Sequence, residues 1–175
     1  VGTTMIQIAR ALGASLVAGT SRDADKLARL KAVGLDLGIL AGRDNLAEAC
    51  MGATGKKGID VAADNVGAGL LGDLMDAAAV KGRIVSIGRL GGKIDQIDLD
   101  KIALKRLKLI GVTFRTRSQD EKIEISRRAW ADLGPAIESG AMKPIVDRTF
   151  PLDEALAAQD YMRANSHIGK IVLTI

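Results

Sequence analysis

Apolar residues recur along this chain at two alternating spacings. In residues 2–12 they fall three or four positions apart, which predicts an amphipathic helix that Gly13 ends. Residues 15–20 form a short apolar run, which predicts a buried strand. The same two patterns predict further helices over residues 22–33, 44–53, 70–80, 98–106, 118–139 and 151–164. They predict further strands over residues 35–40, 58–64, 83–88, 107–114, 144–150 and 168–175.

Strands and helices that alternate through short, glycine-marked joints are typical of an α/β fold with a doubly wound parallel sheet. Local signals place three of the helix starts. Asp44 is expected to cap the helix that follows it, Ser118 and Glu121 form a capping-box pattern, and Pro151 suits the first turn of a helix. No internal repeat or linker divides the chain, so one domain is expected.

Composition agrees with this fold and narrows the function. Hydrophobic residues make up 47% of the 175 residues and aromatic residues only 2%, which suits an aliphatic core between helices and a parallel sheet. The net charge of +4 is scattered, and the basic run at residues 105–108 has no aromatic side chain for base stacking. No apolar run approaches the roughly 18 residues of a membrane span. We therefore expect neither a nucleic-acid partner nor a membrane.

One cysteine and one histidine limit the metal and disulfide chemistry of the chain. Cys50 has no partner for a disulfide or a metal pair, so a reducing, cytoplasmic location and no zinc in this segment are expected. Cys50 is expected to fill a core position, and His167 is expected on a surface loop. Tyr161 is followed four residues later by Asn165, which argues against the Tyr-x-x-x-Lys site of short-chain dehydrogenases.

The turn at Val1 and Gly2 is typical of the last glycine of a glycine-rich loop and of the helix that the loop starts. Followed by the strand at residues 15–20, it indicates a dinucleotide-binding unit. The first strand and the first glycines of that unit are not in the sequence. We therefore expect residues 1–175 to be an NAD(P)-binding Rossmann domain that is truncated at its N-terminus and lacks its first, central strand.

Hydroxyls and cations, rather than an acid, end the second strand of this unit. An acidic residue here would bind the 2′-hydroxyl of NAD, whereas Ser21, Arg22 and Lys26 could hold the 2′-phosphate of NADP. The pattern favours NADPH over NADH; plain surface cations are the alternative. Asp23 and Asp25 follow in the first turn of the next helix, where acids stabilise the helix dipole.

A second group of candidate residues, Asp64, Asn65, Val66 and Gly67, follows the strand at residues 58–64. Strand ends on this side of a parallel sheet face the ligand crevice. Asn65 offers a donor and an acceptor to a ribose, and Gly67 lets the backbone approach a ligand closely. A tight turn is the alternative, and it explains the glycine better than the Asp-Asn pair.

Six motifs in order carry a resemblance: Val1-Gly2 with Gln7, Gly19-Thr20-Ser21-Arg22, Asp64-Asn65-Val66-Gly67, and residues 83–88, 114–118 and 167–173. Together they resemble the C-terminal part of a quinone oxidoreductase-type member of the medium-chain dehydrogenase/reductase family of zinc-binding dehydrogenases. The resemblance covers essentially the whole chain. It departs from the family at residues 40–43, where a tyrosine that serves the adenosine end is absent and Arg43 is a candidate replacement.

The resemblance implies which residues face the cofactor. By the family's pattern, these would be Val1 and Gly2 at the pyrophosphate, Ser21, Arg22 and Lys26 at the 2′-phosphate, Asn65 and Gly67 near the riboses, Ile87 and Gly88 beside the nicotinamide, the backbone of Thr113, Phe114 and Arg115 at its carboxamide, and Asn165 from the C-terminal loop.

The resemblance also implies an activity: hydride transfer from NADPH to a quinone, an enone or a similar small electrophile. Such proteins carry a GroES-like substrate domain that this sequence lacks, so we expect this segment alone to be inactive. No residue stands out as a catalytic acid or base. A homodimer through the strand near residues 109–114 is also implied. Two alternatives remain open: a non-catalytic nucleotide-binding or dimerisation fragment, and a relative of zinc-dependent alcohol dehydrogenases.

Overall fold

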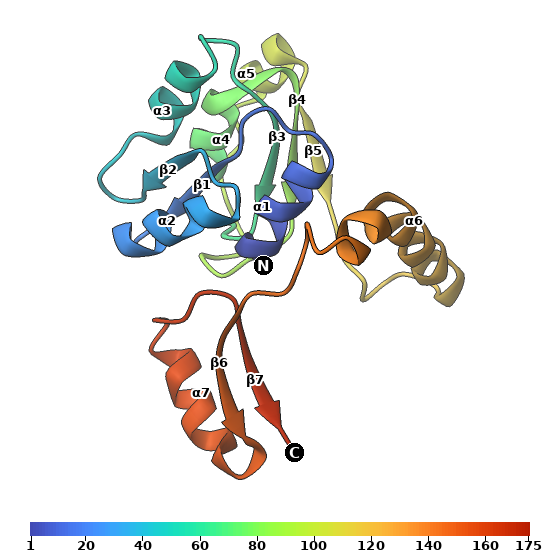
Figure 1. The fold of residues 1–175 in the computed structure, drawn as a ribbon. Helices are drawn as coiled ribbons and strands as arrows, with labels where there is room; N and C mark the ends of the chain where they lie inside the picture. The colour runs from blue at the N-terminus through green and yellow to red at the C-terminus, as the bar shows by residue number, and fades with distance from the viewer.

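The computed structural model describes all of residues 1–175 as an α/β chain (Figure 1). The α-helices are α1 (Gly2–Ala11), α2 (Ala24–Leu30), α3 (Leu46–Ala53), α4 (Leu71–Ala77), α5 (Leu99–Lys105), α6 (Gln119–Glu138) and α7 (Ala155–Arg163). The strands are β1 (Ala18–Ser21), β2 (Leu37–Leu40), β3 (Ile59–Asp64), β4 (Ala78–Ser86), β5 (Lys108–Gly111), β6 (Val146–Pro151) and β7 (Lys170–Thr174). Short 3-10 turns extend α2 and precede α7.

Every strand pairs in parallel, and the strands form three separate sheets. β1 pairs with β2, β3 and β5 flank β4, and β6 pairs with β7. In Figure 1 the first two sheets lie side by side in the upper body, while β6, β7 and α7 form a lobe below it. β1 and β3 belong to different sheets and do not pair with each other. The predicted α/β fold of parallel strands is confirmed.

Two clusters of buried side chains hold the upper body together. The larger joins the two sheets and their covering helices through Ile39, Leu46, Cys50, Ala62, Leu74, Met75, Ala77, Ala78, Ile84 and Leu107. The smaller packs α1 and α2 on β1 and β2 through Ile6, Val17, Leu27 and Leu35. Cys50 therefore fills a core position as predicted, and its burial raises the pKa of the thiol.

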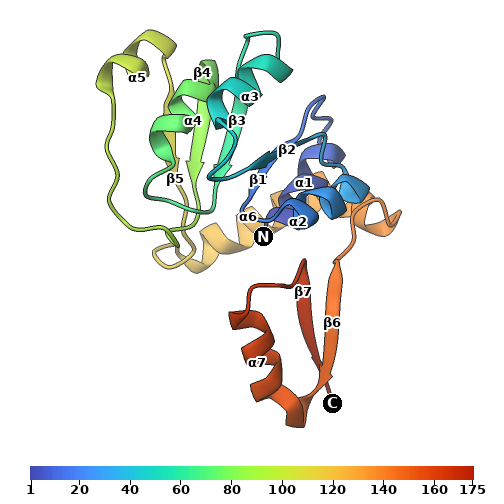
Figure 2. The ribbon, with the colours of Figure 1, turned by 90° about the vertical axis from the view of Figure 1, so that its left-hand side faces the viewer.

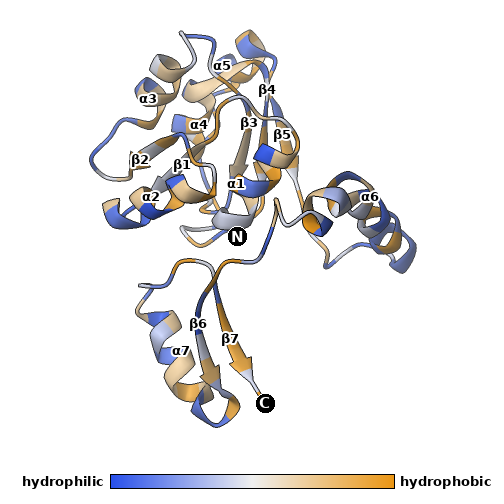
Figure 3. Cartoon of the chain, in the orientation of Figure 1, coloured by the Kyte–Doolittle hydropathy of each residue, from blue (hydrophilic) through white to orange (hydrophobic).

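The lower lobe contacts the upper body through a few polar groups. Gln7 on α1 accepts the Lys143 backbone N–H at 2.9 Å, and Arg29 on α2 lies 3.4 Å from the Asp147 carboxylate on β6. Figures 1 and 2 both show the lobe standing apart from the rest, with α7 beside its two strands. Figure 3 colours β7 as hydrophobic along most of its length, although α7 is the only helix beside that sheet.

The chain exposes more surface than a compact protein of its mass. Its accessible surface is 11638 Å², whereas the usual scaling gives about 8,100 Å² for 18.3 kDa. Part of the excess is apolar: Val61 in β3, Trp130 in α6 and Leu156 in α7 are 49%, 57% and 75% exposed. These elements therefore carry apolar faces that nothing in the chain covers. No helix has the length and apolar character required to cross a membrane.

Most predicted elements are confirmed, with shifted ends that have local causes. Asn45, not Asp44, caps α3, because its side chain accepts the Glu48 N–H at 3.1 Å while the Asp44 carboxylate turns back to the Leu40 N–H at 2.8 Å. The capping box at Ser118 is confirmed. The helix predicted from Pro151 begins only at Ala155, because β6 continues through the proline.

The helix predicted over residues 70–80 ends earlier, at Ala77, and β4 follows without a loop. Lys105 of α5 caps this end, because its ammonium donates to the carbonyls of Met75, Asp76 and Ala78 at 2.7–2.9 Å. A cation at a helix C-terminus satisfies carbonyls that have no N–H partner within the helix.

Candidate functional site

A cavity of about 210 Å³ lies where α1 begins and β1 ends. Its walls come from three parts of the chain that are far apart in sequence: the start of α1, the end of β1 with α2, and the loop between α7 and β7. The lining residues are Val1, Gly2, Thr3, Thr20, Ser21, Lys26, Leu30, His167, Ile168 and Gly169. Four of the predicted cofactor residues, Val1, Gly2, Ser21 and Lys26, therefore meet in one place.

The electrostatics of this cavity suit an anion. Val1 offers no side-chain cap to α1, and no acid lies in the first turn of that helix. The first N–H groups of a helix carry partial positive charge, which attracts phosphate and carboxylate groups. Lys26 adds a full positive charge on the facing wall. The cavity thus combines a helix N-terminus, a hydroxyl from Ser21 and an ammonium.

Asn165 lies next to this cavity, because its backbone carbonyl accepts a hydrogen bond from the Lys26 ammonium. Asn165 adopts the left-handed conformation, with φ of 53°, at the point where the chain leaves α7. Arg22 directly follows Ser21, but it is exposed and is not among the lining side chains. Asp23 caps α2 through the N–H groups of Asp25 and Lys26, which confirms its predicted helix-end role.

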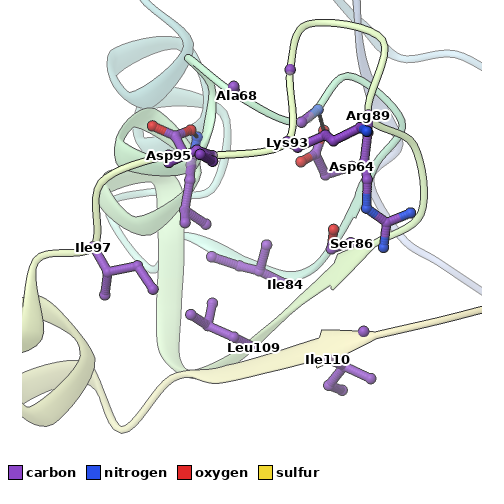
Figure 4. Close-up of a pocket in the computed structure, with 15 residues that line it drawn as sticks. Asp64, Ala68, Ile84, Ser86, Arg89, Lys93, Asp95, Ile97, Leu109 and Ile110 are labelled. Atoms are coloured by element: carbon purple, nitrogen blue, oxygen red, sulfur yellow. Dashed lines mark hydrogen bonds between the residues drawn. The ribbon is translucent and has the colours of Figure 1, made fainter.

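A larger cavity, of about 450 Å³, lies between the β3–β5 sheet and the loop over residues 88–97. Figure 4 shows Ile84 and Leu109 side by side on its floor, with Lys93 and Asp95 on the loop above. The Asp95 carboxylate accepts the N–H groups of Gly69 and Leu71, and hydrogen bonds from backbone N–H groups, that of Gln96 first, lower its pKa. The Asp95 carboxylate therefore fixes the loop over residues 88–97 to the start of α4.

Gly67 lines this larger cavity, and the structure gives a structural reason for the Asp64–Gly67 motif. The Asp64 carboxylate is buried and accepts the N–H groups of Val66 and Gly67 at 2.8 and 3.0 Å. A tight turn thus accounts for the aspartate as well as for the glycine, contrary to the expectation from sequence. With φ of 87°, Gly67 approaches the protein's own backbone: a Cβ there would lie 2.8 Å from the Gly92 carbonyl oxygen.

The predicted residues Asn65, Ile87 and Gly88 lie together where two loops meet. The N–H groups of Ile87 and Gly88 both donate to the Asp64 carbonyl, at 2.8 and 3.0 Å. A Cβ on Gly88 would lie 2.0 Å from the Asn65 carbonyl oxygen, so only glycine fits. None of the three lines either cavity described above.

The third predicted group, Thr113 to Arg115, lies apart from both cavities. β5 ends at Gly111 rather than at residue 114, and these residues are exposed in the turn that follows. The Thr113 carbonyl accepts the Arg117 guanidinium at 2.9 Å, and the Thr113 hydroxyl accepts the Arg115 N–H at 3.1 Å. The early turn ends the pairing of β5.

Residues 33–173 match the family model described as zinc-binding dehydrogenase. The chain belongs to the zinc-binding dehydrogenase family. It is 31% identical over 179 residues to a 2-haloacrylate reductase of a Burkholderia species, covering 98% of this chain and 51% of that protein. It is 24% identical over 175 residues to quinone oxidoreductase-like protein 2 of Bos taurus, covering 99% and 50%. The expected resemblance to quinone oxidoreductase-type proteins is thereby confirmed.

Among solved structures, a mycobacterial protein complexed with NADPH superposes on this chain with a TM-score of 0.80 and 28% identity. The match covers 99% of this chain and 54% of the other. The chain therefore spans about half the length of the relatives that it matches, and the matched half has the Rossmann-like fold.

The residues of this family member do not fit a zinc ion. Cys50 is buried on the inner face of α3, whereas His167 lies on the loop before β7, in a different part of the molecule. No three histidine, cysteine, aspartate or glutamate side chains gather closely enough to hold a metal. No step of the chemistry is therefore assigned to a metal held by this chain.

Sequence analysis did not assign two residues to the smaller cavity: His167, which lines it, and Asp147, which binds the loop that forms one of its walls. His167 was expected on the surface, yet it is half-buried in the cavity wall, and its Nδ1 is buried without a hydrogen-bond partner. Asp147 in β6 binds the loop that carries His167, through the Ile168 N–H at 3.0 Å. The only sequence signal for Asp147 is a charged residue in a strand, between Val146 and Arg148.

Proposed function

We propose that this chain is the nucleotide-binding part of an NADPH-dependent oxidoreductase that transfers hydride to a quinone, an enone or a similar electrophile. The observation that carries the proposal is the smaller cavity, where a helix N-terminus, Ser21 and Lys26 converge. Family membership supports it, as do the 2-haloacrylate reductase and quinone oxidoreductase-like relatives and the neighbour complexed with NADPH.

In this proposal the cofactor's phosphates occupy the smaller cavity. Val1 and Gly2 would offer the N–H groups of the first turn of α1 to the pyrophosphate. Ser21, Arg22 and Lys26 would bind the 2′-phosphate, and Asn165 would border it. The rest of the cofactor would extend toward Asn65, Gly67, Ile87 and Gly88, and then toward the backbone of Thr113, Phe114 and Arg115.

The bound dihydronicotinamide would supply the hydride, and this chain's own residues would bind and orient the cofactor. No side chain is proposed as an acid or base, because Asp64 and Asp95, the carboxylates of the larger cavity, are held by backbone N–H groups. The proton that completes reduction would come from water. The substrate would bind between this domain and the GroES-like domain that the family resemblance implies.

The same proposal has three further parts. A central strand between β1 and β3 would join the two sheets into one, since β1 pairs only with β2 and β3 only with β4. A homodimer would form through β5 and the residues near 109–114, because β5 is an exposed edge strand. The protein would act in the reducing cytosol, where its single free thiol, Cys50, needs no partner.

Charge reversal at Arg22 tests the cofactor assignment. The expected result for Arg22→Glu is NADPH binding weakened by about 10–100-fold with NADH binding nearly unchanged, because a charge-assisted hydrogen bond to phosphate is replaced by repulsion. Arg127→Glu is the matched control, because Arg127 is an exposed arginine on α6, away from the cavity. Dissociation constants for both nucleotides come from fluorescence titration. An unchanged preference for NADPH in Arg22→Glu contradicts the assignment.

A second candidate function is a nucleotide-binding module without turnover. It is favoured because both carboxylates of the larger cavity, Asp64 and Asp95, already accept backbone N–H groups. It predicts tight NADPH binding with no NADPH oxidation when a quinone is added. Oxidation that depends on the electrophile excludes it. Loss of the absorbance of the reduced nicotinamide follows the oxidation of NADPH directly.

A further inference from the structure

Asp147 is a buried acid that the cofactor proposal does not use. Its side chain is 7% exposed. One oxygen accepts the Ile168 backbone N–H at 3.0 Å and lies 3.4 Å from the Arg29 guanidinium, and the other accepts the Tyr161 hydroxyl at 2.7 Å. The Ile168 N–H first, then the Tyr161 hydroxyl and Arg29, hold the pKa of Asp147 below its usual value. The carboxylate therefore joins a strand, a loop and two helices.

The loop that Asp147 holds is one wall of the smaller cavity. His167, Ile168 and Gly169 line that wall, and the Asn165 carbonyl meets the Lys26 ammonium opposite. The loop also packs tightly on the residue that precedes β6, because a Cβ on Gly169 would lie 2.3 Å from the Ile145 carbonyl oxygen. The position of the wall is thus set from β6.

The contact with Arg29 ties this arrangement to the upper body. Lys26 and Arg29 lie one turn apart on α2, and they reach the loop and β6 respectively. Tyr161 braces the same carboxylate from α7 and lies against Phe150 and His167, with ring centroids 5.9 and 6.3 Å away. Asp147 therefore sets the distance between the loop and α2, across which the cavity opens.

We propose that Asp147 is a positioning residue for the cofactor site, acting through the loop of residues 165–169. The proposal rests on the proposed function, since it takes the smaller cavity as the place where the phosphates of the nucleotide bind. Without the carboxylate, the buried Ile168 N–H loses its acceptor, the loop moves away from α2, and His167 and Ile168 no longer close the cavity. The adenosine-phosphate end of the cofactor then binds more weakly.

The test compares Asp147→Ala, Asp147→Asn and Tyr161→Phe with the wild type, using NADPH and 2′-phospho-ADP-ribose, which lacks the nicotinamide. Calorimetric titration should show about 10-fold weaker binding of both ligands to Asp147→Ala and about 3-fold weaker binding to Tyr161→Phe. Asp147→Asn keeps an acceptor for the Ile168 N–H and should recover part of the loss. Asp153→Ala, which removes an exposed acid from the same lobe, is the control and should bind as the wild type does.

Amide hydrogen exchange separates positioning from general instability. In Asp147→Ala and Tyr161→Phe, exchange should rise in residues 165–169 and stay unchanged in α1 and β1. Wild-type affinity for both ligands in these two variants, or an equal rise of exchange throughout the chain, overturns the positioning role while leaving the proposed function intact. If the wild type binds neither ligand, both the proposed function and the positioning role of Asp147 are wrong.

Discussion

Replacing Lys105 with methionine should destabilise the fold far more than an ordinary surface substitution. The Lys105 ammonium donates to the carbonyls of Met75, Asp76 and Ala78 at 2.8, 2.7 and 2.9 Å. Met75 and Ala78 are almost fully buried, at 0% and 3% exposed. Methionine keeps an unbranched apolar side chain of similar length but removes all three donors, so the loss reports on the hydrogen bonds rather than on packing.

The expected loss of stability follows from the carbonyl groups that lose their hydrogen-bond donor when Lys105 is replaced. A buried acceptor without a partner costs about 1–3 kcal/mol, and the loss of a cation at a helix C-terminus costs about 0.3–1 kcal/mol and up to about 2 kcal/mol in partly buried geometry. The three bonds share one ammonium and are not independent, so their costs do not add fully. We expect Lys105→Met to lower the free energy of unfolding by about 2–4 kcal/mol.

Lys101→Met is the matched control, one turn earlier on the same helix. Lys101 pairs with the Asp76 carboxylate at 2.6 Å, but both side chains are over a third exposed, at 36% and 44%. Such a surface ion pair contributes about 0–1 kcal/mol. Urea unfolding followed by far-UV circular dichroism gives both values. Equal losses in the two variants would refute the argument that burial of the capped carbonyls decides the cost.

Two further predictions concern the loops and the acid response. Gly88→Ala should destabilise the fold by about 1–3 kcal/mol, because its Cβ would lie 2.0 Å from the Asn65 carbonyl oxygen; Gly72→Ala in α4, where a Cβ meets open space, should instead stabilise by about 0.5–1 kcal/mol in the same urea assay. The folded-state pKa of Asp147 lies below its ordinary value of 3.8, so its contribution is complete above that value and is lost as the pH falls through the folded pKa. The difference in unfolding free energy between wild type and Asp147→Asn should therefore shrink below about pH 4, and a constant difference from pH 7 to pH 2 contradicts this.

Hydrophobic spacing and local capping rules predict the elements of this fold because those signals act within a few residues. The capping box at Ser118, the helix after Gly2 and the strand that ends at Asp64 all depend on neighbours in sequence. The end of α4 was predicted wrongly for the same reason. The ammonium that caps α4 belongs to Lys105, about 30 residues later in the chain, and no local sequence pattern predicts a donor at that distance.

The candidate site shows the same division between local and distant contacts. The residues at the start of α1 and the end of β1 were predicted from a strand-turn-helix pattern, and the structure brings them into one cavity. The opposite wall was only partly predicted. The family resemblance implied Asn165, which meets Lys26 across 139 positions in sequence, but His167 and Ile168 were not predicted, because no local pattern links them to α1 or β1. Asp147 was missed because its role depends on Ile168, Tyr161 and Arg29, which only the fold brings together.

The uncovered surface between the two main sheets gives physical support to the proposed central strand. β1 pairs only with β2 and β3 only with β4, and Val61 in the middle of β3 is 49% exposed although its neighbour Ala62 is in the core. A hydrogen bond gained by a free backbone group at these edges contributes about 0.5–1.5 kcal/mol, and burial of an exposed valine contributes about 1.5–3 kcal/mol. One strand between β1 and β3 would supply the hydrogen bonds, whereas Val61, on the face of the sheet opposite Ala62, needs an element that covers that face.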